Sequence, residues 1–129
     1  MSQTIAVAVK GFSVTKCIDP KSKTEIPTKF KPKAVSLLKS VQVDPPKGKT
    51  LGPYSVDIAV AILMAPKGLK AEVKILFSQK DIYLGEASGS ASVQTTNPDK
   101  GDTEAAVEAA LGEAIKTVIG GIKNNAKKP

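Results

Sequence analysis

The sequence contains no histidine and no arginine among its 129 residues. Histidine is the commonest general base and a common metal ligand, so its absence excludes Ser-His and Cys-His relays. The absence of arginine removes the planar fork that binds phosphate or guanine through two parallel hydrogen bonds. Because no complete catalytic motif occurs either, we expect a protein that is not an enzyme and that has no cofactor and no metal site.

Cysteine, aromatic residues and long apolar runs are also scarce. The single cysteine, Cys17, excludes an intramolecular disulfide and a cysteine metal cluster. Cys17 is either a thiol activated by the neighbouring Lys16 or an incidental cysteine in an apolar setting. No apolar run reaches the roughly 20 residues of a membrane span. No secretory signal or glycosylation sequon is visible, which favours the cytoplasm, although a mature exported fragment would look the same.

Positive charge is abundant, and it is concentrated in the N-terminal part of the chain. All 19 basic residues are lysines, and the formal net charge is +7. The first 50 residues hold ten lysines and three acids, a net +7, whereas the remaining residues hold nine of each and are neutral. Such a region is either a solubilising surface or a site for a polyanion such as a nucleic acid.

The candidate residues for binding a polyanion or another partner all lie in this N-terminal region. Phe30 is flanked by two lysines and either stacks on a base or anchors its segment in the core. The full candidate set is Lys21, Lys23, Lys29, Phe30, Lys31, Lys33, Lys47 and Lys49.

Proline dominates the segment from residue 16 to 53, which holds six of the nine prolines. Since proline lacks a backbone N–H, it disfavours both helix interiors and central strands. We therefore predict a long, Pro- and Lys-rich excursion here, with a possible short helix starting at Pro32 and burying Val35 and Leu38.

Four segments show the alternation of apolar and polar residues that is typical of strands. They span residues 4–15, 55–65, 69–78 and 83–93. Gly11 marks a possible bulge in the first. The connections between the last three are too short for a crossover, so these strands form an antiparallel meander.

The strand over residues 83–93 has an unusual face made of Tyr83, Gly85, Ala87, Gly89, Ala91 and Val93. Glycine in a strand often marks close approach by another element. A helix predicted over residues 102–122, capped by Asp102 or Thr103, has one apolar stripe that could dock there. The other face of the strand carries Ser88, Ser90 and Ser92 and is either solvated or suited to a repeating ligand. The acids just before the helix are explained by helix capping or, alternatively, by a calcium site.

Together these patterns predict a single α+β domain, residues 1–129, with a mainly antiparallel four-stranded sheet. One long C-terminal helix packs on one face, and residues 123–129 form a frayed tail. One helix leaves the second face uncovered, so we predict a small, soluble, non-enzymatic binding or assembly module that self-associates or binds another protein. The alternative is a module that binds nucleic acid or another polyanion through its lysines.

Overall fold

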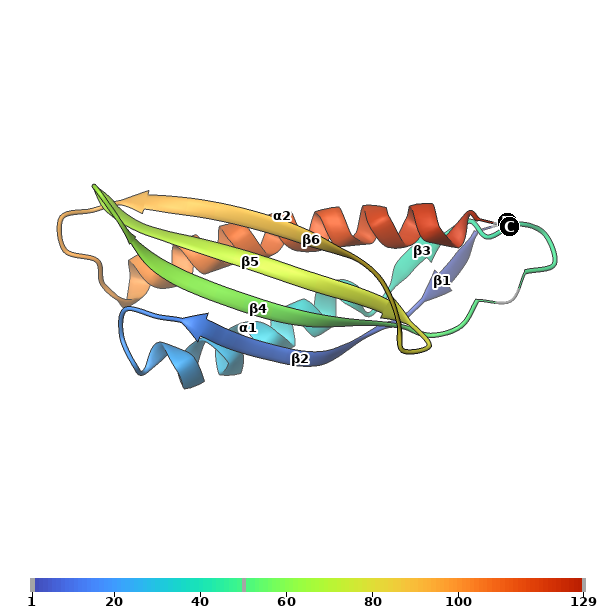
Figure 1. Ribbon diagram of the computed structural model, residues 1–129, viewed down its shortest axis with the longest axis horizontal. Helices are drawn as coiled ribbons and strands as arrows, with labels where there is room; N and C mark the ends of the chain where they lie inside the picture. The colour runs from blue at the N-terminus through green and yellow to red at the C-terminus, as the bar shows by residue number, and fades with distance from the viewer. Residues whose placement is uncertain (1, 50, 129) are drawn as a thin grey trace.

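The computed structural model describes residues 2–49 and 51–128 and has two layers, a sheet and a pair of helices (Figure 1). The sheet orders its strands β2-β4-β5-β6, and β1 pairs separately with β3. The predicted domain spans residues 1–129, of which Met1, Thr50 and Pro129 lie outside the described residues. The predicted frayed tail, residues 123–129, also includes Pro129. The elements are β1 (Gln3–Ile5), β2 (Val7–Lys16), α1 (Ser22–Leu38), β3 (Val41–Val43), β4 (Tyr54–Ala65), β5 (Gly68–Gln79), β6 (Ile82–Gln94) and α2 (Lys100–Ala126).

The predicted meander is confirmed, because β4 pairs antiparallel with β5 and β5 with β6. A bulge at Leu84 shifts the start of β6, so that Phe77 pairs with Gly85 but Ser78 pairs with Tyr83. The shift turns Tyr83 away from the small face on which alternation had placed it, and its side chain is 60% exposed.

The sheet is mixed, and the prediction of a mainly antiparallel sheet is therefore wrong. Strand β2 pairs parallel with β4, its neighbour in the sheet. Parallel neighbours need a long crossover connection, which the chain between the two strands supplies. The first predicted strand is also two strands, since β1 ends at Ile5 and β2 begins at Val7. A register shift between Val9 and Gly11 confirms the predicted bulge.

The predicted long excursion is wrong as well, because residues 16–53 contain the 17-residue helix α1 and the strand β3. The buried residues of α1 recur at every fourth position: Ile26, Phe30, Ala34 and Leu38. This stripe faces the sheet, whereas Val35, predicted to be buried, is exposed. Pro27 and Pro32 lie inside the helix and obscured it, because burial of one face outweighed their cost.

Helix α2 is longer at both ends than predicted. Asp99 is its N-cap and forms a capping box with Asp102, which accounts for these two acids without a calcium ion. The helix continues to Ala126, which is fully buried, so residues 123–126 are not a frayed tail. A Cβ on Gly121 would lie 2.9 Å from Cζ of Phe77, so this glycine permits close packing and does not end the helix.

Both helices pack on the same face of the sheet, α1 against β2 and α2 against β5 and β6 (Figure 1). The core between the layers is aliphatic apart from Phe30, Tyr54 and Phe77. The opposite face of the four-stranded sheet, here named the open face, is covered by no element of the described chain. Within the described residues, neither helix is long and apolar enough to cross a membrane.

Candidate functional site

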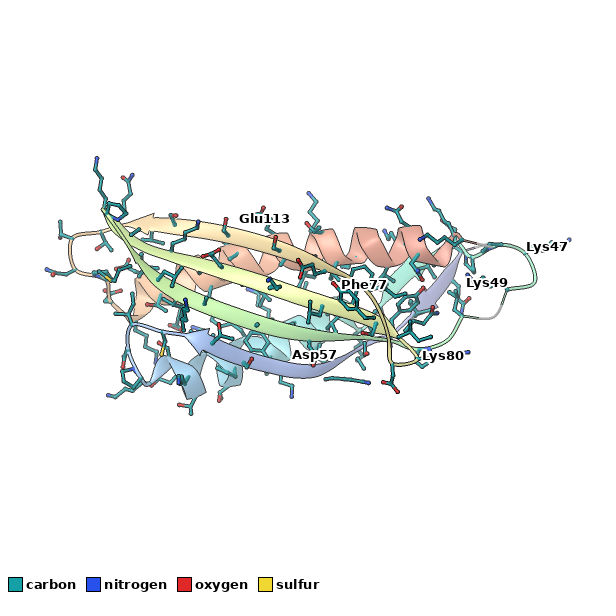
Figure 2. All side chains as sticks on the ribbon, viewed as in Figure 1. Lys47, Lys49, Asp57, Phe77, Lys80 and Glu113 are labelled. Atoms are coloured by element: carbon teal, nitrogen blue, oxygen red, sulfur yellow. The ribbon has the colours of Figure 1, made fainter. Side chains whose placement is uncertain are left out.

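The candidate lysines do not gather into one patch. Lys23 and Lys31 are exposed on α1, and Lys21 is exposed at its N-cap. Lys47 and Lys49 lie at the far end of the molecule, in the loop beside the C-terminus (Figure 2), where the Lys49 ammonium donates to the carbonyl oxygen of Lys128. The excess charge of the N-terminal sequence is therefore divided between two regions.

Phe30 cannot stack on a base in this fold. Its side chain is only 2% exposed and belongs to the core. The ring is one of the four apolar contacts that fix α1 on the sheet, as the anchor interpretation expects.

Lys29 and Lys33 form ion pairs with carboxylates of α2. Lys29 pairs with Glu104 and Lys33 with Glu108, while Glu25 of α1 pairs with Lys100 at 3.4 Å. The Lys33 ammonium, through its hydrogen bond and its charge, lowers the pKa of Glu108 below its ordinary value. Sequence reasoning missed this ladder of three ion pairs between the helices. Its signal was the matching four-residue spacing of 25, 29, 33 and 100, 104, 108, with opposite charges at each step.

A cleft of about 460 Å³ opens between the N-terminal turns of α1 and α2. Ile18, Ile26 and Ile62 form its apolar surface, and Asp19, Glu25, Asp99 and Glu104 are its acids. Its size suits a small molecule, but each of these acids already has a partner. Glu25 and Glu104 pair with lysines, Asp19 accepts from the backbone N–H of Lys21, and Asp99 caps α2.

The open face is covered by no element of the described chain, and on it Lys74 of β5 pairs with Glu86 of β6 at 3.9 Å. Strand β5 contributes Lys70, Glu72 and Lys74, here named the β5 ridge. The neighbouring strands contribute small side chains, Ala59 and Ala61 from β4 and Ser88, Ser90 and Ser92 from β6. A hollow of about 500 Å³ lies here, lined by residues of both small-residue stripes and by Glu72 and Lys74.

Cys17 is half-buried and follows the end of β2. In the described residues, no group of three or more acids or cysteines lies in a position to hold a metal ion. Two further surfaces of the described chain are the open face and the basic end near the C-terminus.

No protein-family description matches the chain, and a comparison with curated proteins likewise finds no match.

Proposed function

We propose that the chain is a non-enzymatic binding and assembly module whose partner is a second copy of itself. The observation that carries the proposal is the one-sided construction of the sheet. Both helices cover the same face, and the opposite face of four long strands carries half-buried Ala59, Ala61 and Leu63 together with exposed Leu76 and Tyr83. Apolar side chains on an otherwise polar sheet face favour contact with another protein.

The absence of histidine and the pairing of the cleft acids support a non-enzymatic role. The single cysteine and the lack of a sequon favour the cytoplasm as its compartment.

Light scattering coupled to size-exclusion chromatography tests self-association directly. The expected result at high protein concentration is a mass of twice the 13.4 kDa chain, with dissociation on dilution. A mass of one chain at every concentration would refute the proposal.

Binding of a polyanion is a second candidate function, restricted to the part of the predicted set that contains Lys47 and Lys49. Lys49 contacts the backbone of Lys128, and Lys47 lies at the same end of the molecule (Figure 2), so positive charge gathers there. Lysine clusters attract nucleic acids through the phosphate backbone and without sequence preference, and salt weakens such binding steeply.

Electrophoretic mobility of generic DNA and RNA at low and high salt tests this candidate. The double variant Lys47→Gln/Lys49→Gln should weaken the shift, whereas Lys29→Gln/Lys33→Gln, which removes two ion-paired lysines, should weaken it less. No shift at low salt would eliminate nucleic-acid binding, and equal effects of the two double variants would place the site elsewhere.

A further inference from the structure

The open face has the size that a stable interface needs. Four strands spaced about 4.8 Å apart span about 19 Å, and the 12 residues of β5 extend about 40 Å. Their product, about 760 Å², is close to the roughly 800 Å² that each partner contributes to a typical stable complex. A partner covering the whole face would therefore form a standard-size interface.

At the middle of the open face, the long side chains of the β5 ridge stand between two rows of small side chains, one on β4 and one on β6. Glu72 pairs with Ala61 on β4 and Ser90 on β6, and Lys74 pairs with Ala59 and Ser88 in the same way. Glu72 and Lys74 thus have a small neighbour on either side, whereas Lys70 lies between Leu63 of β4 and Ser92 of β6. The hollow at Ala59, Ala61, Ser88 and Ser90 reflects this difference in height.

The order of charges along the β5 ridge is self-complementary when the second strand runs in the opposite direction. The ridge reads Lys70, Glu72, Lys74, with successive side chains on the same face. An antiparallel copy centred between Glu72 and Lys74 places each Glu72 opposite the partner's Lys74. A parallel copy in register would instead place like charges opposite each other, which is destabilising.

The crossing angle of packed sheets places the end of each ridge over acids of the other copy. Face-to-face sheets cross at about 30°. Lys70 lies three residues, or about 10 Å, from the centre of the ridge, so the crossing displaces it sideways by about 5 Å, one strand spacing. Lys70 then lies beside the partner's Leu76 and over Asp57 or Glu86 of the partner, the residues that flank Leu76 on β4 and β6.

We propose that two copies of the chain pack open face to open face around a two-fold axis, with β5 antiparallel to the partner's β5 and with Glu72 paired to the partner's Lys74. This arrangement rests on the proposed self-association and specifies its surface. The resulting four-layer particle has helices on both outer sides and a closed double sheet inside, with ion pairs at its centre.

Charge-swapped variants test the arrangement. Glu72→Lys makes the ridge wholly basic, and Lys70→Glu/Lys74→Glu makes it wholly acidic. Each variant should remain monomeric in light scattering, because like charges face each other, and an equimolar mixture should form a one-to-one heterodimer. Asp44→Lys is the control, since it changes the net charge as Glu72→Lys does but lies outside the open face; it should dimerise like the wild type.

The possible outcomes separate the arrangement from the proposed function. A wild-type dimer with monomeric variants that combine on mixing supports both. A wild-type dimer whose variants still self-associate, or whose monomeric variants fail to combine, overturns the open-face arrangement and leaves self-association in place. A wild-type chain that is monomeric throughout overturns both. Far-ultraviolet circular dichroism establishes that each variant is folded, and Lys74→Glu alone replaces the double variant if the latter does not fold.

Discussion

Gly89 determines how closely α2 can approach the sheet. A Cβ built on Gly89 would lie 2.3 Å from the carbonyl oxygen of Ala110 and 2.8 Å from the backbone nitrogen of Ala114. Both contacts are with helix backbone, which cannot rotate away as a side chain can. Close docking of the helix therefore requires glycine here, in agreement with the small face of β6 seen in the sequence.

Replacing Gly89 with alanine should lower the free energy of unfolding by about 1–3 kcal/mol, because the methyl group forces α2 away from β6. The matched control is Gly112→Ala on the exposed side of α2, where a Cβ meets no atom within 4 Å. It should raise stability by up to about 1 kcal/mol through helix propensity. Urea denaturation measures both, and equal effects of the two substitutions would contradict close packing at Gly89.

Tyr54 provides a residue-scale pH dependence. It is only 1% exposed, its hydroxyl donates to Oδ1 of Asn125 at 2.5 Å, and burial raises the pKa of its phenol above the ordinary value. Below about pH 10 the phenol is neutral in both the folded and unfolded states. Above that pH the unfolded chain loses its proton first, so stability falls as the pH rises toward the folded-state value.

Tyr54→Phe should cost about 1 kcal/mol at neutral pH through the lost hydrogen bond. The same variant should lose less stability than the wild type between neutral pH and pH values above about 10, because the raised phenol pKa is gone. Tyr83→Phe, which removes the exposed tyrosine, is the control. Chemical denaturation at neutral and alkaline pH decides the matter; parallel curves for Tyr54→Phe and the wild type would contradict the linkage.

At the scale of elements, α1 is a helix that forms in spite of its prolines. Pro32 is exposed near the middle of the helix and leaves the carbonyl of Thr28 without its usual donor. Burial of Phe30 and Leu38, together with the ion pairs to α2, outweighs that loss. The helix is therefore stabilised by tertiary contacts more than by its own propensity.

Pro32→Ala should raise the free energy of unfolding by about 2 kcal/mol, since it restores a helical N–H and removes a steric clash while adding some freedom to the unfolded chain. Pro66→Ala, in the exposed turn between β4 and β5, is the matched control. It should lower stability by about 0.4–1 kcal/mol, because there the proline restricts only the unfolded chain. Thermal melts monitored by circular dichroism provide the comparison, and destabilisation by Pro32→Ala would show that the proline has a structural role.

Elements with clean local periodicity were predictable from the sequence, and those decided by distant contacts were not. Strands β4, β5 and β6 alternate over most of their length, and α2 has an uninterrupted apolar stripe. For α1, the prolines argued against a helix that tertiary contacts nevertheless stabilise. Because this helix was missed, the crossover that allows β2 to pair parallel with β4 was missed as well. For the candidate site, the excess of lysines in the first 50 residues was visible, but the ion pairs of Lys29 and Lys33 depend on a helix that had not been foreseen.

At the scale of the whole molecule, folding distributes over several regions the positive charge that the sequence concentrates in its first 50 residues. The N-terminal lysines separate into ion pairs with α2, exposed positions on α1 and a cluster near the C-terminus; Lys10 pairs with Asp81 at 2.7 Å. On the open face positive and negative residues alternate along β5. A surface of mixed sign favours a specific protein partner over a polyanion, because like charges of the partner would be rejected at defined positions.

Self-association should also make the thermal stability depend on protein concentration. A dimer that dissociates on unfolding gains about 1.4 kcal/mol for each tenfold rise in concentration, which for two chains of this length raises the melting temperature by about 3 °C. The Glu72→Lys variant, whose ridge repels its copy, should melt at the same temperature at every concentration, whereas Asp44→Lys should follow the wild type. Because mass action acts only on the associated state, scanning calorimetry over a wide concentration range measures the contribution of the second copy. A wild-type melting temperature that does not change with concentration would contradict self-association. The open face, with its alternating lysines and glutamate, would then be an ordinary solvated sheet surface.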